Sequence, residues 1–227
     1  RALYKLSKIK EENLQKLEEK NFYDWLLENH QNENTIESFW ELFSIPALND
    51  DLKNVSASIG IRLFQVAFIE SDNNANFAIP NVGLTKLLGD SAENFLKNSN
   101  SKIIKNQEVK SLVIKNNKIK GVMTRDDQII NSDIVISTLP PNQFLNIIPE
   151  KYKTSFQKIN KINIDPIIGI HLWFDKHFFT EKFMVVLKSP IQWIFNDSEI
   201  KNFNSNNQHI VISLSNAWEW KNKSKKL

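Results

Sequence analysis

The side chains best suited to acid–base or metal chemistry in this chain are its four histidines, at positions 30, 171, 177 and 209. No two of them have the spacing that is typical of metal ligands. The chain contains no cysteine, which excludes disulfides, thiolate catalysis and zinc–cysteine sites. The sequence therefore predicts no metal site.

His171 has the most informative position of the four. It is the one polar group on a face of the predicted strand Pro166–Phe174, and Gly169 precedes it on the same face. A glycine there leaves room for a ligand to lie against the sheet. Two interpretations stay open: a histidine with satisfied hydrogen bonds in the core or at the surface, and a residue of a substrate pocket.

Other motifs that would define a reaction do not occur in the 227 residues. There is no Gly-x-Ser-x-Gly nucleophile elbow and no phosphate loop. The five glycines are too far apart for a dinucleotide-binding fingerprint. The acidic pairs at positions 50–51 and 126–127 are neighbours in sequence, so their side chains diverge and solvated turns explain them. Catalytic motifs alone therefore name no reaction.

The composition predicts a globular protein of one large domain or two small ones. Hydrophobic residues make up 41%, with 15 Phe and 6 Trp, and each large side chain that is buried stabilises the fold by roughly 1.5–3 kcal/mol. The net charge is +3 and the lysines are dispersed, so we expect no nucleic-acid partner. We expect a cytoplasmic location. The chain begins at Arg1 within a helical pattern, from which we expect an internal fragment.

Residues 109–141 contain the clearest structural pattern. The runs Val109–Lys115 and Lys118–Thr124 are rich in β-forming residues and are separated only by Asn116 and Asn117. Asparagine tolerates positive φ, so this pair predicts a two-residue β-hairpin turn. A second turn leads to a short strand at Gln128–Ile130.

The segment Asp133–Ser137 follows this meander and is apolar without alternation. Such a run is typical of a parallel strand that is covered on both faces. Ligands bind beyond the carboxyl ends of strands of this kind in open α/β sheets. We therefore expect residues 137–140 to lie beside a cofactor or substrate.

The first seventy residues have helical periodicity. We expect a helix that begins at Asn21, another that is capped by Thr35 and interrupted by Pro46, and a third that begins at Asn54 or Ser56. The third is apolar on nearly all sides, and its small residues let another element approach closely. Two interpretations of this apolar helix stay open: it packs in the core, or it forms the wall of an apolar substrate tunnel.

The remaining chain combines short helices with a second group of strands. Helices are expected at 83–98, 144–148 and 152–159, and a short strand at 102–104. After the strong strand Pro166–Phe174, further strands of an antiparallel sheet are expected at 184–187, 192–195 and 209–214.

Several stretches resemble the squalene-associated FAD-dependent desaturases. This family includes hydroxysqualene dehydroxylase and is related to phytoene desaturases and flavin amine oxidases. The run FWELFSIPALN at 39–49, with Ser56-Ala57-Ser58 after it, is similar to a motif of that family. Three later stretches fall in the family's order: Phe77–Pro80 with Gly83-Leu84, Val109–Pro140, and Ile170–Asp175 with Gln192–Phe195.

The resemblance implies an α+β and α/β fold, a fragment of a two-domain amine-oxidase-like flavoprotein whose cofactor is FAD. Residues 1–75 would form the helical part of the substrate domain, 76–145 a β-meander segment of the FAD-binding domain, and 146–227 the sheet part of the substrate domain. The family's Gly-x-Gly-x-x-Gly unit and its Gly-Asp segment do not occur in these residues. For the 227 residues alone we therefore expect little or no FAD affinity.

The resemblance also implies site residues. The backbone of Val109 would face the adenine, and Thr138 and Pro140 would lie near the flavin. The residues expected to line the substrate pocket are Phe39, Trp40, Phe64, Phe68 and His171. No catalytic acid or base follows from the resemblance.

The implied activity is an oxidoreductase reaction on a long isoprenoid hydrocarbon. The resemblance favours reductive dehydroxylation of hydroxysqualene to squalene, and a carotenoid desaturase of the phytoene type is the nearest alternative. A protein of another class, a prenyl-binding escort without catalysis, is also similar to these flavoproteins. Peripheral association with a membrane is one way for the protein to reach so apolar a substrate.

Overall fold

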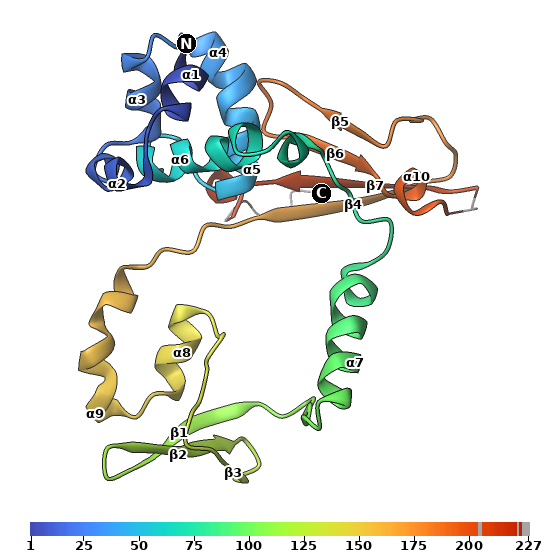
Figure 1. Ribbon diagram of the computed structural model, residues 1–227. Helices are drawn as coiled ribbons and strands as arrows, with labels where there is room; N and C mark the ends of the chain where they lie inside the picture. The colour runs from blue at the N-terminus through green and yellow to red at the C-terminus, as the bar shows by residue number, and fades with distance from the viewer. Residues whose placement is uncertain (204–205, 222, 224–227) are drawn as a thin grey trace. The chain divides into compact units, whose positions relative to one another are not determined.

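The computed structural model describes residues 1–203, 206–221 and 223 (Figure 1). The chain forms two compact units. One, called here the helix–sheet unit, comprises Arg1–Leu87 and Asp165–Leu227, and the other, the meander unit, comprises Leu88–Ile164. Within the described residues, no helix is long and apolar enough to cross a membrane.

The meander unit contains a three-stranded antiparallel sheet in the order β1-β2-β3. Asn116 and Asn117 connect β1 to β2 with φ angles of 50° and 58°, so the predicted hairpin turn is confirmed. Gly121 has a φ of 138°, and a Cβ there would overlap the backbone of Ile130 on β3, so close strand packing requires glycine at this position. The elements are α7 (Asp90–Asn98), β1 (Val109–Lys115), β2 (Lys118–Thr124), β3 (Ile129–Asn131), α8 (Pro141–Ile147), α9 (Glu150–Lys153) and a 3₁₀ helix (Thr154–Lys161).

Two expectations for this region were wrong. Residues 102–104 form no strand, and the segment Asp133–Ser137 is not a buried parallel strand. Ile134 and Ile136 are 77% and 86% exposed. A parallel strand is stable only beside a parallel neighbour and under crossover helices, and the described residues supply neither. The apolar side of the helix predicted at 83–98 is likewise exposed at Leu84, Leu88 and Phe95.

The helix–sheet unit places a group of short helices beside a four-stranded sheet (Figure 1). The sheet is antiparallel in the order β4-β7-β6-β5, as expected from the pattern of the strands. Its strands are β4 (Ile168–Phe174), β5 (Phe183–Val185), β6 (Trp193–Asn196) and β7 (Gln208–Leu214). Its helices are α1 (Ala2–Ser7), α2 (Glu11–Leu14), α3 (Phe22–Glu28), α4 (Glu33–Thr35), α5 (Glu41–Leu48), α6 (Ala57–Phe64) and α10 (Asp197–Lys201).

Side-chain caps define where these helices begin. Asn21 accepts a hydrogen bond from the backbone N–H of Asp24 at 2.7 Å, and Ser56 accepts one from Ile59 at 3.3 Å, so both predicted starts are confirmed. The expected cap at Thr35 was wrong. Asn32 caps α4 instead, because its Oδ1 accepts from the backbone N–H of Thr35 at 2.9 Å.

The core of this unit is aromatic. The rings of Phe22, Trp40 and Phe64 are fully buried and lie 4.5–6.0 Å apart between centroids, which is the range in which aromatic pairs add to the energy of burial. Gly60 of α6 faces this cluster, and a Cβ at Gly60 would overlap the ring of Phe22. The close approach predicted for the small residues of this helix therefore occurs at Gly60.

Gly60→Ala is predicted to destabilise the helix–sheet unit. Overpacking of a buried position costs about 1–3 kcal/mol. Because the added Cβ would overlap the Phe22 ring itself, we expect a cost in the upper half of that range, and the gain of about 1 kcal/mol in helix propensity offsets only part of it. We expect a net loss of about 1–2 kcal/mol in urea unfolding followed by tryptophan fluorescence. All six tryptophans belong to this unit, so the signal reports on it alone.

Gly83→Ala is the matched control, since nothing lies within 4 Å of a Cβ at Gly83. We expect its free energy of unfolding to stay within about 0.5 kcal/mol of the parent. A Gly60→Ala chain as stable as the Gly83→Ala chain would contradict the close packing of Phe22 on α6.

Candidate functional site

The two faces of the four-stranded sheet have different characters, because side chains alternate along each strand. One face packs Ile168, Ile170 and Phe174 of β4 against Ile210 and Ile212 of β7 and forms a second core. The opposite face carries Gly169, His171 and Trp173 of β4, with Ser213 and Trp193 on the neighbouring strands. This second face, called here the open face, supplies the side chains of the candidate site.

An apolar pocket of about 450 Å³ lies between α5, the end of α6 and the open face. Such a concave apolar site is the kind that binds small apolar molecules. Its lining includes Leu42, Phe43, Pro46, Ala47, Leu63, Ala67, Phe68, Phe77, Ile167, Trp193, Phe195 and Ser213.

Phe77 and Trp193 form one aromatic wall of this apolar pocket, and Phe183 packs against Phe77 outside the lining. Phe77 stacks on Trp193 with 5.2 Å between ring centroids and 3° between ring planes, and it lies 5.2 Å from Phe183. Phe77 is 57% exposed. A flat aromatic wall that is open on one side suits a long hydrocarbon better than a compact polar ligand.

Helix α5 reaches the pocket because Pro46 does not interrupt it. The helix continues to Leu48, and Asn49 ends it with a φ of 57°, so the expected interruption was wrong. A proline inside a helix lacks the N–H that would bond the carbonyl four residues earlier, which here is that of Leu42. The indole N–H of Trp193 donates to this carbonyl at 3.3 Å, and the sheet thereby replaces the missing donor.

Asn49 fixes the end of α5 to the sheet segment. Its side-chain amide donates to the carbonyl of Asp165 at 2.9 Å, and its Oδ1 accepts from the backbone N–H of Asn216 at 2.8 Å. Two segments that are more than a hundred residues apart in sequence are therefore joined beside the apolar pocket.

The structure separates the five residues that were expected to line a substrate pocket. Phe68 lines the apolar pocket, and Phe39 packs behind it with 6.4 Å between their ring centroids. Trp40 and Phe64 are 1% and 0% exposed and belong to the core, so they support the wall without reaching its surface. Helical periodicity marks core and pocket positions alike, because both are apolar. His171 lies on the open face, outside this lining.

A second pocket lies in the meander unit. This meander pocket has a volume of about 770 Å³, and Val109 and Thr138, two of the three residues expected at the cofactor, both line it. Pro140 is outside the lining and stands just before α8. The other residues of the lining include Glu108, Lys110, Val122, Arg125, Val135, Leu139, Gln143, Asn146 and Ile147.

The charged side chains of the meander pocket are paired within the unit. Arg125 forms an ion pair with Glu108 at 2.8 Å, and Lys110 forms one with Asp127 at 2.7 Å. A hydrogen bond from the Thr124 hydroxyl lowers the pKa of the neighbouring Asp126. The cations are already paired, and the lining combines aliphatic side chains with the amides of Gln143 and Asn146. The pocket therefore suits a flat ring with polar edges better than a phosphate.

Sequence reasoning missed several residues of the apolar pocket. Trp193 and Phe195 were recognised as strand residues, and their alternation with Ile194 was the signal that both point to one face. Phe77 had no such signal, because only the fold brings it to Trp193. Among the described residues, no cluster of three or more His, Asp or Glu side chains suited to a metal ion occurs.

Comparison with protein families and curated proteins gives two kinds of match. Residues 2–225 match the family model described as flavin containing amine oxidoreductase. A 15-cis-phytoene desaturase of an Oncidium hybrid cultivar is 22% identical over 166 residues, and one from Synechococcus elongatus is 28% identical over 75 residues. These matches cover 70% and 32% of this chain, but only 27% and 16% of the two relatives.

Solved structures show the same fold. An oxidoreductase from Methanosarcina mazei superposes with a TM-score of 0.71 at 18% identity, over 86% of this chain and 47% of that one. A redesigned variant of putrescine oxidase gives 0.71 at 14% identity, over 99% of this chain and 51% of that one. The predicted fold class, helices and antiparallel sheet with a β-meander in an amine-oxidase-like flavoprotein, is confirmed.

The carbonyl of Leu42 yields a double-mutant test. Trp193→Phe keeps an aromatic ring but removes the indole N–H, and we expect a loss of about 1 kcal/mol in the free energy of unfolding. Pro46→Ala restores the backbone N–H that can bond Leu42. We therefore expect Pro46→Ala to stabilise the Trp193→Phe chain by about 1 kcal/mol more than it stabilises the parent.

Urea unfolding of the four chains measures this coupling. The effect of Pro46→Ala on the unfolded state is the same in both backgrounds and cancels in the cycle. An equal effect of Pro46→Ala with and without the indole would show that the two donors do not serve the same carbonyl.

Proposed function

Because the chain belongs to the flavin containing amine oxidoreductase family, we propose that it provides the substrate-binding surface of an FAD-dependent oxidoreductase that acts on a long isoprenoid hydrocarbon. FAD is the cofactor. The apolar pocket carries the proposal: aromatic and aliphatic side chains dominate its lining, and none of the described residues in that lining is charged. A long hydrocarbon gains free energy there by leaving water.

The lining of the meander pocket suits one of the two aromatic ring systems of FAD, the adenine or the isoalloxazine. Its apolar floor at Val109, Val122 and Ile147 suits an aromatic ring face, and the amides of Gln143 and Asn146 suit polar ring edges. When bound, FAD supplies the hydride-transfer chemistry. The protein's own part is to bind the substrate, hold its chain in one orientation and exclude water from it.

The reaction we propose first is reductive dehydroxylation of hydroxysqualene to squalene. The motif at 39–49, with Ser56-Ala57-Ser58, supports this choice, since it resembles the squalene-associated family. In the structure this motif covers α5, which lines the apolar pocket from Leu42 to Ala47. The segment that carries the resemblance is thus also the segment that would contact the substrate.

Desaturation of a carotenoid precursor is the second candidate. The curated relatives reported above are both 15-cis-phytoene desaturases, and a polyene of that kind needs the same apolar walls. The two reactions differ in direction: one consumes reducing equivalents and the other releases them.

Turnover separates the two candidates. The full enzyme, loaded with FAD, is supplied with hydroxysqualene under reducing conditions and with phytoene under oxidising conditions, and the products are separated by chromatography. We expect squalene from the first mixture and no desaturated product from the second. Turnover of phytoene alone would overturn the squalene assignment, and turnover of neither would overturn the proposed substrate class.

Ala67→Phe tests the apolar pocket itself. Ala67 lines the pocket, so the added ring occupies space that the substrate needs. We expect at least a tenfold loss in kcat/KM for the isoprenoid substrate, which corresponds to about 1.4 kcal/mol. Val66→Phe is the matched control, because Val66 is 40% exposed and lies outside this lining. Equal losses in both variants would show that the substrate binds elsewhere.

A further inference from the structure

Three polar side chains form a hydrogen-bonded chain at the edge of the open face. Nδ1 of His171 lies 3.0 Å from Nε2 of His209, and Nδ1 of His209 lies 2.9 Å from a carboxylate oxygen of Asp197. Strands β4 and β7 pair His171 with Val211 and Trp173 with His209. The two histidines are therefore diagonal neighbours on the same face of the sheet.

The inner members of this chain are held in place. The ring of His209 stacks on Trp173 with 4.5 Å between centroids and 4° between planes. The backbone N–H of His209 donates to the Ser198 hydroxyl at 2.9 Å. The side chains of His209 and Asp197 are only 15% and 13% exposed, whereas His171 is exposed. The hydrogen-bonded side chains thus extend from the mostly buried Asp197 to the exposed His171.

When His209 is neutral, the groups around it determine the direction of every hydrogen bond in this chain. Asp197 forms an ion pair with Lys201 of α10 at 2.8 Å, and an ionised carboxylate only accepts hydrogen bonds. Nδ1 of His209 must therefore donate, which leaves a lone pair on its Nε2. Nδ1 of His171 donates to that lone pair, so Nε2 of His171 carries a lone pair of its own.

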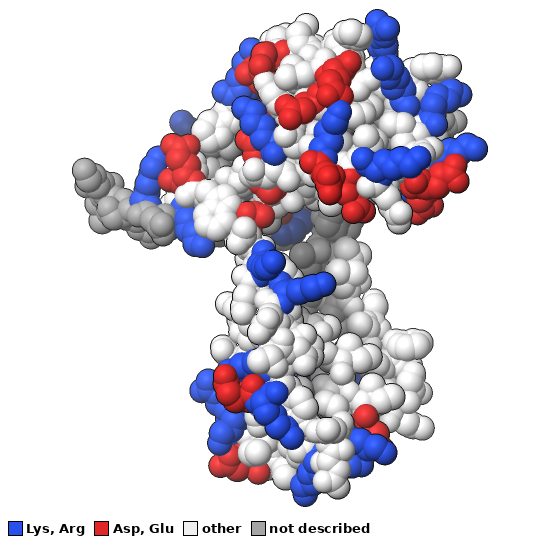
Figure 2. Space-filling view, turned by 90° about the vertical axis from the view of Figure 1, so that its left-hand side faces the viewer, with Lys and Arg blue, Asp and Glu red and all other residues white. Residues whose placement is uncertain are grey.

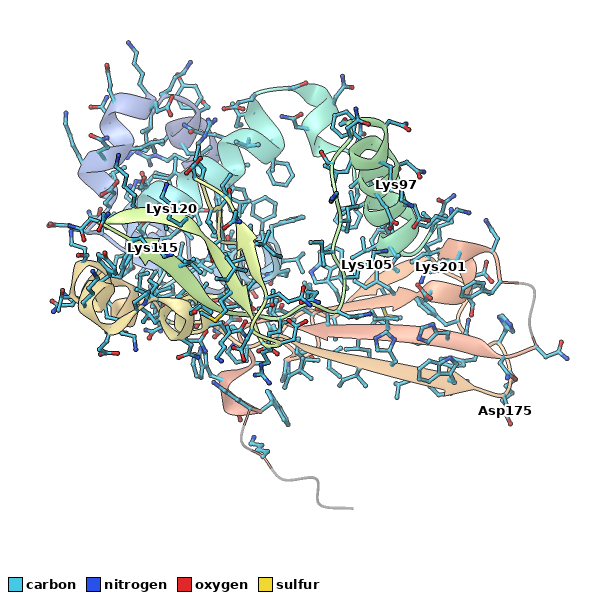
Figure 3. All side chains as sticks on the ribbon, turned by 90° about the horizontal axis from the view of Figure 1, so that it is seen from below. Lys97, Lys105, Lys115, Lys120, Asp175 and Lys201 are labelled. Atoms are coloured by element: carbon cyan, nitrogen blue, oxygen red, sulfur yellow. The ribbon has the colours of Figure 1, made fainter. Side chains whose placement is uncertain are left out.

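Lys201 is the charged group that contacts this hydrogen-bonded chain directly, through Asp197. Strand β6, the other neighbour of β7, carries no titratable group in its residues Trp193–Asn196. On β4 the next such group after His171 is Asp175, just beyond the end of the strand. Figure 3 shows Asp175 well separated from Lys201, the residue that pairs with Asp197.

We propose that Asp197, His209 and His171 form a proton relay in which Nε2 of His171 exchanges a proton with the hydroxyl group of an alcohol bound beside Trp173. The ligand class, an alcohol with an apolar chain, rests on the proposed function. The relay itself rests on the hydrogen-bond geometry. The 68% exposed ring of Trp173 offers an apolar surface. Gly169 adds space, since nothing lies within 4 Å of a Cβ there.

The proton transfer balances within these residues. As the O–H bond of the alcohol breaks, a new N–H bond forms at Nε2 of His171, and the proton on Nδ1 of His171 passes to Nε2 of His209. The positive charge then rests on His209 beside the Asp197 carboxylate, which stabilises it as the carboxylate of a catalytic triad stabilises its imidazolium. The electron pair of the broken O–H bond stays on the oxygen as an alkoxide, and the reverse path returns the proton to that oxygen. His171 is the catalytic residue, and His209 and Asp197 are positioning residues.

The 227-residue chain without flavin tests the relay by NMR of ¹⁵N-labelled histidine rings at pH 8, where a histidine of ordinary pKa is neutral. We expect both His171 and His209 to carry their proton on Nδ1, and Asp197→Asn to abolish this preference, because an amide donates as well as accepts. Asp197→Glu should restore it. Asp175→Asn, the matched control just beyond the end of β4, should leave it unchanged.

Binding of farnesol to the same chain tests the ligand class. Farnesol should shift the Nε2 resonance of His171, and its methyl ether, which has no hydroxyl proton, should leave that resonance in place and bind about fivefold more weakly. A proton on Nε2 of His171 in the free chain, or the same shift with both compounds, would overturn the relay. These readouts need no turnover, so they are independent of the outcome with hydroxysqualene and phytoene.

Discussion

The attachment of helix α5 to the sheet is the interaction on which the rest of the helix–sheet unit depends. Pro46 leaves the carbonyl of Leu42 without a helical partner, and Trp193 supplies the donor from β6. Asn49 then ties the end of the helix to the backbone on either side of the sheet segment. A polar group that a helix cannot satisfy costs free energy when buried, and here the sheet satisfies it. The apolar pocket exists because these bonds hold α5 against one face of the sheet.

Because side chains alternate along each strand, the two faces of the four-stranded sheet differ in composition. One face is a core of isoleucine and leucine, and the open face carries the aromatic wall at one end and the histidines at the other. The two proposed sites are therefore built on one sheet, which fixes them relative to each other within the unit. In the meander unit, charges of both signs also lie close together as ion pairs. On the face of the molecule shown in Figure 2, basic and acidic side chains are interspersed.

Local patterns in the sequence predicted local structure well. The hairpin at Asn116 and Asn117, the cap at Ser56 and the antiparallel strands followed from short-range rules, and the structure confirms them. Long-range pairing could not be predicted. No property of His209 indicates that register places it beside His171, and Phe77 meets Trp193 only in the folded chain. The strand expected at Asp133–Ser137 failed for the same reason, because its stability depends on neighbours that its own residues do not specify.

Asparagine takes the role that glycine has in most proteins. Among the described residues, ten non-glycine residues have positive φ, and seven of them are asparagines, including those at 49, 116, 117 and 216. The whole chain has only five glycines. Most side chains adopt this left-handed conformation at a cost of about 1 kcal/mol, which asparagine partly avoids through its short amide. An asparagine at a turn can also form side-chain hydrogen bonds to a neighbouring segment, as Asn49 does. A single asparagine can therefore both reverse the chain and attach it to another part of the fold.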